Sequence, residues 1–372
     1  MGTGVSLRGC AHSLIFPPFL AGAVSNGTVD TLTKVSEVRA ERVAVAHDQA
    51  TGMQAVIAVD DSTLGPGLGG VRWMPYPDVD AAVAEACRLA RGMTLKNALA
   101  ELPYGGAKSV ILSQDDGADR TAVLRAFGRM VADLHGAYIP GVDMGTTIED
   151  LAVIGKVGAE VACDHEDPSP WTALGVYAGI VAAVHHLDHR DLSGHRVVVQ
   201  GAGHVGSSLA LRLADAGAEV VVTDIDPERS ERVAASVGGK SVEPEEALGI
   251  SCDVLAPCAQ ARVITPTNTP NLGCRIVAGA ANDTLSERSG AAELADRGIV
   301  YVPDFLLNAG GVIHIHALRS GWDHQRLGEE VMGIGHRTAS ILDRAEATGR
   351  TPLEVAEEMA TDRLGHPMSV PL

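Results

Sequence analysis

The chain has 372 residues, and its 47 acidic against 29 basic side chains give a formal net charge of −18. The length predicts two domains, and the acidic balance argues against a nucleic acid or an anionic membrane as partner. No apolar run is long enough to span a bilayer.

The cysteines and the N-terminal segment indicate the cellular compartment. Six cysteines are scattered without a CxxC pair, which favours reduced thiols in the cytoplasm and argues against a metal site. Residues 1–30 are expected to form a disordered arm. The apolar stretch after Arg8 faintly resembles a signal peptide, but Pro17 and Pro18 interrupt it, so secretion is the weaker alternative.

The first domain is expected to cover residues 31–165 and to mix strands with helices. Apolar spacing predicts a hairpin at residues 41–61, a glycine-rich loop at 65–73 and a helix at 78–93. A strand at 109–112, a helix at 121–136 and a strand at 137–147 follow. Lys96 then lies near the end of the first helix. Asp143 lies where the last strand opens into glycine and threonines, so a carboxylate stands at a strand end.

From Gly194 onwards the pattern changes to short, continuous apolar strands separated by helices. This pattern is typical of a parallel sheet that is covered on both faces. The strands are predicted at residues 195–201, 219–226, 254–259, 275–281 and 298–304.

The motif GAGHVG at residues 201–206 follows a predicted strand and opens a predicted helix, which is the context of a dinucleotide-binding loop. Gly201 allows the tight turn, Gly203 lets the backbone approach a pyrophosphate, and Gly206 permits close packing of helix on strand. The helix N-terminus then faces the phosphates. A structural glycine turn, or a Rossmann-like domain for another nucleotide such as S-adenosylmethionine, is the alternative.

Asp224 ends the next strand, where a carboxylate accepts hydrogen bonds from the adenosine ribose and repels a 2′-phosphate. NAD is therefore expected rather than NADP. Further cofactor contacts are assigned to Ala202, His204, Val205, Ile225 and Ala259.

These patterns predict an α/β protein of two domains with a cleft between them. Residues 31–165 are expected to form the substrate-binding domain, and residues 166–334 a Rossmann NAD-binding domain. The helices of residues 335–372 are expected to fold back and join the first domain.

Two lysines, Lys96 in RGMTLKN and Lys108 in LPYGGAKSV, are candidates for chemistry. A buried ammonium group is costly, so both are expected to face a cleft. Two ammonium groups held close depress each other's pKa, and partial burial does the same, while a carboxylate such as Asp143 opposes both effects. One lysine can then act as a base near neutral pH, and the other can hold a carboxylate.

Seven segments resemble, in order, the glutamate, leucine, phenylalanine and valine dehydrogenase family: GLGGVRW, RGMTLKN, PYGGAKSVIL, GVDMGTT, CDVLAPCA, AGAAND and PDFLLNAGGVIH. The likeness runs from Val43 to Leu364. By this resemblance, Lys96 binds the substrate α-carboxylate, Lys108 activates water and Asp143 shuttles protons. The implied reaction is the reversible oxidative deamination of an L-amino acid by NAD, which yields a 2-oxo acid and ammonia. The resemblance also implies a homo-oligomer, with residues 31–165 as the oligomerisation domain.

The resemblance also bears on the substrate side chain. Glutamate members carry a lysine in the first glycine-rich segment, whereas Leu68 stands there, so a charged side chain would be left unpaired and an apolar one is expected. Gly141 matches a position that is small in phenylalanine enzymes and alanine in leucine enzymes. Asn97 looks like leucine and valine members, so phenylalanine and leucine or valine all stay open.

Other residues are assigned by the same resemblance. The remaining substrate contacts are Gly69, Gly70, Met93, Asn308, Val312 and Ile315. Asn282 and Asn308 are expected to contact the cofactor. Asp283 departs from the family, because a second asparagine often stands there.

Two other functions are possible readings of the same residues. An oxidoreductase of 2-hydroxy acids would need a catalytic histidine paired with a carboxylate, which the lysines and Asp143 do not provide. A catalytically silent regulatory member is disfavoured because those three residues are intact. His185 and His189 share a helix face, but no third metal ligand accompanies them, so a solvated face is expected.

Overall fold

The computed structural model describes residues 40–112, 117, 119–162 and 166–366, so the arm expected at residues 1–30 lies outside the described residues. Backbone contacts divide the chain into two units. The first comprises Met1–Thr94 and Tyr104–Asp164, and the second comprises Leu95–Pro103 and His165–Leu372. The α/β fold class predicted from the sequence is confirmed.

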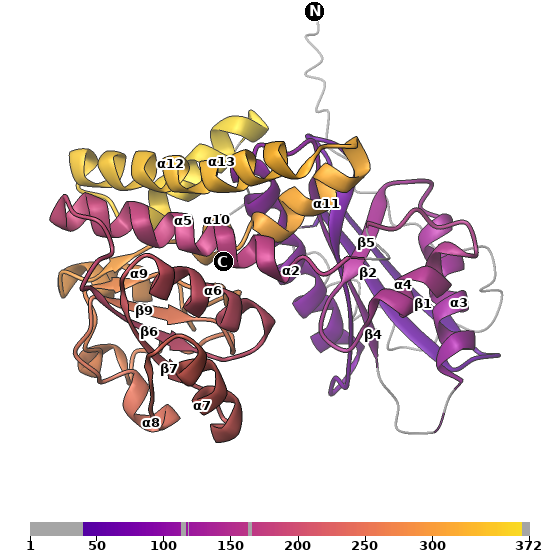
Figure 1. The fold of residues 1–372 in the computed structure, drawn as a ribbon. Helices are drawn as coiled ribbons and strands as arrows, with labels where there is room; N and C mark the ends of the chain where they lie inside the picture. Colours follow the sequence, from indigo (N-terminus) through magenta and orange to yellow (C-terminus); the bar gives the residue numbers. More distant parts are fainter. Residues whose placement is uncertain (1–39, 113–116, 118, 163–165, 367–372) are drawn as a thin grey trace, which may run out of the picture. The chain divides into compact units, whose positions relative to one another are not determined.

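A five-stranded sheet in the order β1-β2-β4-β3-β5 is the centre of the first unit (Figure 1). Its strands are β1 (Arg42–Asp48), β2 (Met53–Asp61), β3 (Gly67–Met74), β4 (Gly105–Leu112) and β5 (Tyr138–Val142). The predicted hairpin is confirmed, because β1 pairs antiparallel with β2. Strand β3 runs parallel to both β4 and β5, which brings the ends of β3 and β5 to one edge.

Alternate residues of β2 and β4 pack on opposite faces of this sheet. Ile57 and Ile111 contact the helices α3 (Arg120–Ala132) and α4 (Ile148–Gly155), while Val56 and Val110 belong to the cluster that contains α2 (Val79–Leu99). The central strands are therefore buried on both faces, which explains their almost unbroken apolar sequence.

Strand β3 corrects one prediction, because residues 65–73 were expected to form a loop. Its glycines permit a close approach of β4: a Cβ on Gly69 would lie 1.6 Å from the carbonyl oxygen of Ala107. Glycine in a strand can mark such an approach instead of a turn.

The second unit contains a parallel six-stranded sheet in the order β11-β10-β9-β6-β7-β8. The parallel sheet was predicted from the sequence, whereas the short strand β8 was not. Its strands are β6 (Arg196–Gln200), β7 (Glu219–Thr223), β8 (Lys240–Ser241), β9 (Val254–Pro257), β10 (Ile276–Val277) and β11 (Val300–Tyr301). The helices are α5 (Ser169–Asp188), α6 (His204–Asp215), α7 (Pro227–Ser236), α8 (Pro244–Ala247), η1 (Thr269–Asn271), α9 (Gly290–Asp296), α10 (Asp304–Leu307), α11 (Gly310–Ser320), α12 (His324–Thr348) and α13 (Pro352–Leu364).

The two C-terminal helices α12 and α13 belong to the second unit, whereas the sequence had led us to assign them to the first domain. Helix α12 lies along α5 (Figure 1). Small residues on α5 allow the contact, since a Cβ on Gly175 would lie 2.6 Å from Cδ1 of Ile334. Within the described chain, no helix has the length and hydropathy that crossing a membrane requires.

Candidate functional site

The loop between β6 and α6 has the geometry that the GAGHVG motif predicts. Gly201 has a φ of 106°, and a Cβ there would lie 2.7 Å from the Cβ of Ala259. A Cβ on Gly206 would lie 1.8 Å from the carbonyl oxygen of Gly201, so helix and strand pack too closely for a larger residue. No atom of the part of the chain that the structure describes lies within 4 Å of a Cβ position on Gly203, which leaves its backbone open to a ligand.

Asp224 follows β7 and links this loop to the next segment. Its Oδ2 accepts a hydrogen bond from the backbone N–H of Ala202 at 2.7 Å, and its Oδ1 accepts one from the N–H of Asp226 at 3.0 Å. Arg229 lies 3.5 Å from Oδ1. The carboxylate is thus fixed beside the glycine loop, next to the exposed side chain of Ile225. These residues fit a dinucleotide, with the carboxylate placed for a ribose diol.

His204 opens α6 and is mostly exposed, and its Nδ1 lies 3.3 Å from a carboxylate oxygen of Asp167. Val205 follows it, half-buried. The imidazole therefore has a protein partner at the N-terminus of the helix.

Lys96 is brought together with two asparagines from distant loops. Its Nζ donates to Oδ1 of Asn282 at 3.2 Å, and Nδ2 of Asn308 donates to the same oxygen at 2.8 Å. Nδ2 of Asn308 also donates to the carbonyl of Ala280 at 3.0 Å, while its Oδ1 is buried and has no partner among the described residues. A buried acceptor without a protein partner can accept a hydrogen bond from a ligand or from a water molecule.

The buried carboxyl group of Asp304 fixes the loop after Asn282 by hydrogen bonds. Oδ2 of Asp304 accepts hydrogen bonds from the N–H of Thr284 at 2.8 Å and from the hydroxyl of Tyr301 at 3.0 Å. Burial raises the pKa of Asp304. Asp283 has a φ of 50°, a conformation that asparagine and aspartate both tolerate, which explains why aspartate can replace the second asparagine of the family.

Lys108 and Asp143 form an ion pair in the first unit, with Nζ 2.9 Å from Oδ2. Nε of Arg72 donates to the same oxygen at 2.8 Å, and its Nη1 donates to Oε1 of Glu85 at 2.7 Å. Burial alone would raise the pKa of Asp143, but Lys108 and Arg72 outweigh burial and lower it to about 2.

Gly70 provides the space for this pair. A Cβ there would lie 2.7 Å from the Cβ of Asp143 and 3.1 Å from Nζ of Lys108. The hydroxyl of Thr146 fixes the turn, because it accepts from the N–H of Asp143 at 3.0 Å and donates to the carbonyl of Val71 at 2.7 Å.

Arg72 and Glu85 were not predicted from the sequence. The signal was available in part, since Arg72 stands two positions after Gly70 and alternate residues of a strand share a face. The glycines of GPGLGGVRW predict a loop instead, and the alternation of a strand does not apply to a loop.

The other predicted substrate residues are divided between the units. Leu68 is 1% exposed on β3, and Met93 on α2 would meet a Cβ on Gly69 at 3.3 Å. Among the described residues, a Cβ on Gly141 would contact only the Cβ of Ala162, at 3.6 Å. In the second unit, Val312 is buried and Ile315 is half-buried on α11.

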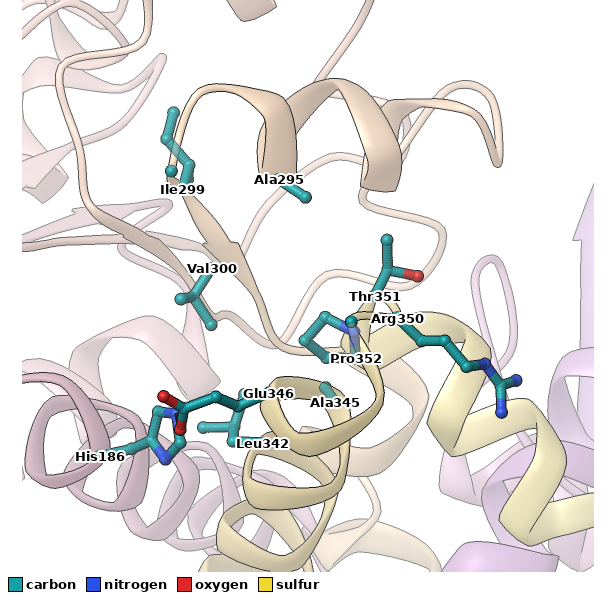
Figure 2. Close-up of a pocket in the computed structure, with 12 residues that line it drawn as sticks. His186, Ala295, Ile299, Val300, Leu342, Ala345, Glu346, Arg350, Thr351 and Pro352 are labelled. Carbon is teal, nitrogen blue, oxygen red and sulfur yellow. Dashed lines mark ion pairs between the residues drawn. The ribbon is translucent and has the colours of Figure 1, made fainter.

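The histidine pair at the C-terminal end of α5 and a cavity in the second unit contain none of the predicted substrate residues. The ring centroids of His185 and His189 lie 6.2 Å apart, and no cluster of metal-ligating residues occurs in the described part of the chain. A cavity of about 300 Å³ lies between β11, α12 and the start of α13 (Figure 2). Its ionisable side chains already have partners, since His186 lies 3.6 Å from Glu346 and Arg350 pairs with Glu358.

Comparison with known proteins identifies the family. Residues 35–157 match the family described as Glu/Leu/Phe/Val dehydrogenase, dimerisation domain, and residues 166–228 and 222–317 match Glutamate/Leucine/Phenylalanine/Valine dehydrogenase. The chain belongs to this family. It is therefore an amino-acid dehydrogenase, an oxidoreductase that acts on the CH–NH2 group and uses a nicotinamide cofactor.

The relatives indicate the branch of the family. The chain is 38% identical to a leucine dehydrogenase of Thermoactinomyces intermedius over 87% of this chain and 90% of the relative. It is 37% identical to a valine dehydrogenase of Streptomyces virginiae, over 91% and 98%. The crystal structure of L-tryptophan dehydrogenase from Nostoc punctiforme superposes with a TM-score of 0.76 at 36% identity, over 90% and 98%. These relatives support the apolar branch of the family.

Proposed function

We propose that the protein catalyses the NAD-dependent, reversible oxidative deamination of an apolar L-amino acid to its 2-oxo acid and ammonia. The observation that carries the proposal is the pair of Lys108 and Asp143, held at 2.9 Å beside Gly70. A base and a carboxylate in contact are what the hydrolysis of an imine needs, because one group must take a proton from water while another passes one to the leaving amine.

Lys96 binds the α-carboxylate of the substrate in this proposal. The hydrogen bond to Asn282 orients its ammonium group, and a positively charged N–H donor suits a carboxylate oxygen. The buried Oδ1 of Asn308 accepts a hydrogen bond from a ligand N–H, which both the amino acid and the nicotinamide carboxamide carry.

NAD, when bound, supplies the acceptor for the hydride that leaves Cα. Lys108, as the neutral amine, takes a proton from the water that attacks the resulting imine carbon, and a carbinolamine forms on the substrate. The ionised Asp143 takes the proton of the carbinolamine hydroxyl and passes it to the amino group. The C=O bond then forms as the C–N bond breaks, and ammonia leaves with the electron pair. The Lys108 proton then returns to solvent.

The substrate side chain is apolar in this proposal. Leu68 supplies no charge and is buried in β3, so a carboxylate side chain would have no cation there. Ala162, at 3.6 Å, is the one described residue that a Cβ on Gly141 would meet, and this supports a large aliphatic or aromatic side chain. Phenylalanine, leucine and valine are the candidates.

Asp224 supports NAD as the cofactor, because its carboxylate is fixed where a 2′-phosphate would meet it. The family description of residues 35–157 as a dimerisation domain supports a homo-oligomer that assembles through the first domain. A cytoplasmic location is proposed from the scattered cysteines.

Oxidation of NADH by 2-oxo acids in the presence of ammonia tests the proposal. We expect turnover with phenylpyruvate, 4-methyl-2-oxopentanoate or 3-methyl-2-oxobutanoate and little with 2-oxoglutarate. Lys108→Ala should lower kcat strongly while NADH still binds. Turnover that needs no ammonia, as for reduction to a 2-hydroxy acid, would contradict the proposal.

A further inference from the structure

Asp143 has two cationic partners on the same oxygen atom. Nζ of Lys108 lies 2.9 Å from Oδ2, and Nε of Arg72 lies 2.8 Å from it. Within the described residues, Oδ1 of Asp143 accepts no hydrogen bond. The two oxygens of this carboxylate are therefore different: Oδ2 is held by the protein, and Oδ1 remains for a ligand.

Arg72 is itself fixed between two carboxylates. Its side chain is 12% exposed, and its Nη1 donates to Oε1 of Glu85 at 2.7 Å while Nε donates to Asp143. Burial lowers the pKa of Arg72, but Asp143 and Glu85 raise it above its ordinary value. A guanidinium group stays charged at every pH at which proteins are folded, and its planar fork fixes both carboxylates.

The charges alternate in sign from Lys108 through Asp143 and Arg72 to Glu85. Lys108 must be neutral when it takes a proton from water, so Asp143 then loses one of its two cationic partners. Arg72 cannot lose its charge in the same way. It is the one of the two cations that remains on Oδ2 throughout the proposed reaction.

We propose that Arg72, braced by Glu85, is a positioning residue that keeps Asp143 ionised while Lys108 is neutral and leaves Oδ1 as the oxygen that exchanges protons with the substrate. The proposal rests on the proposed roles of Lys108 and Asp143. The role of Arg72, the arginine of GGVRW, is inferred from its contact with the carboxylate of Asp143 alone.

The other groups that face Asp143 do not replace Arg72. Tyr138 on β5 is fully buried, and burial raises the pKa of its hydroxyl, which stays neutral and donates to the carbonyl of Gly69 at 3.0 Å. Burial also raises the pKa of Tyr76, which follows β3. Glu85 is an anion and acts on Asp143 only through Arg72.

The test compares Arg72→Ala, Arg72→Lys and a matched control, Arg88→Ala. Arg88 lies on α2 and pairs with Oε2 of the same Glu85 at 2.8 Å, but no ion pair joins it to Asp143 among the described residues. The kinetic readouts are kcat and KM for the amino acid and the rescue of Arg72→Ala by added guanidinium ion. The pKa of Asp143 is measured by carbon NMR of labelled full-length protein, and its signal is assigned by comparison with Asp143→Asn. NADH binding and thermal unfolding report on folding.

In Arg72→Ala we expect the pKa of Asp143 to rise by about one to three units, because a cation within hydrogen-bond distance is lost. We expect kcat to fall at least about tenfold, with KM less affected and with partial recovery on adding guanidinium ion. Arg72→Lys should hold the pKa of Asp143 nearer to the wild-type value, and Arg88→Ala should keep wild-type kcat and pKa.

An unchanged kcat, an unchanged pKa of Asp143, or the same loss in Arg88→Ala overturns the proposal. If Arg72→Ala does not fold, Arg72→Lys decides. An altered pKa of Asp143 in Arg72→Lys together with an unchanged kcat would count against the proposal. A wild-type protein with no ammonia-dependent oxidation of NADH would count against the proposed function, while the NMR titration would still decide on Arg72.

Discussion

Lys96 donates a hydrogen bond to Asn282 at 3.2 Å, although 186 positions separate the two residues along the chain. Asn308 donates to the same amide oxygen at 2.8 Å. The position of the ammonium group therefore depends on two loops of the second unit's sheet. A carboxylate clamp built in this way is sensitive to either asparagine.

Asn282→Ala should weaken substrate binding more than it lowers turnover. The substitution removes the acceptor that orients Lys96, and a hydrogen bond to a charged group contributes roughly 1.5–3 kcal/mol. We expect KM for the amino acid to rise about tenfold or more in initial-rate assays. Lys156→Ala, at an exposed lysine, is the control, and an unchanged KM in Asn282→Ala would contradict the role given to Lys96.

Gly70→Ala should remove most activity. The added methyl group would lie 2.7 Å from the Cβ of Asp143 and 2.9 Å from the carbonyl oxygen of Val142, so Asp143 must move away from Lys108. We expect kcat to fall by about a hundredfold or more, since displacement of a catalytic group by about 1 Å has that effect.

Gly92→Ala is the matched control for this substitution. Gly92 lies inside α2, and outside the helix's own backbone no described atom comes within 4 Å of its Cβ position. Alanine there should therefore stabilise the helix by about 0.5–1 kcal/mol and leave kcat unchanged. Wild-type activity in Gly70→Ala would show that the close contact of Lys108 and Asp143 is not needed.

The sequence predicted the second unit better than the first, for a physical reason. The glycine loop, its flanking strand and helix, and Asp224 are local features, and each is read from consecutive residues. Strand β3 was misread because Gly69 and Gly70 are turn signals, and only the position of β4 shows that they allow a backbone contact.

The candidate site could be predicted in part. The sequence singled out Lys108 and Asp143 as candidates, the family resemblance supplied their roles, and the structure places the two in contact. Arg72 and Glu85 could not be found in that way, because their contact joins β3 to α2 and needs both elements in place. The C-terminal helices show the same limit: an amphipathic helix predicts a buried face, and the small residues of α5 that receive α12 are visible only in the packed structure.

Asp143 should make the stability of the protein depend on pH in the acid range. Its pKa is lowered from 3.8 to about 2 by Lys108 and Arg72 against the opposing effect of burial. Because the folded-state pKa is depressed, the stabilisation is fully present above the unfolded value of 3.8 and is lost as pH falls through about 2. A shift of this size corresponds to roughly 2 kcal/mol.

Chemical unfolding of wild type and Asp143→Asn at pH 6 and near pH 2.5 measures this contribution. The difference in the free energy of unfolding between the two proteins should be larger at pH 6 and should shrink at the lower pH. A difference that does not change with pH would mean that the charge of Asp143 contributes nothing to stability.

Asp224 should determine the choice between the two nicotinamide cofactors. Its carboxylate accepts hydrogen bonds from Ala202 and Asp226 and has Arg229 at 3.5 Å, so its removal leaves Arg229 without this partner and available to a 2′-phosphate. In Asp224→Ser we expect the Kd for NADH to rise about tenfold and the Kd for NADPH to fall, as measured by fluorescence titration. Glu228→Gln, an exposed position on α7, should bind both as wild type does. Equal affinity of the wild-type protein for NADH and NADPH would rule out this role, because the carboxylate could then not be what repels the phosphate.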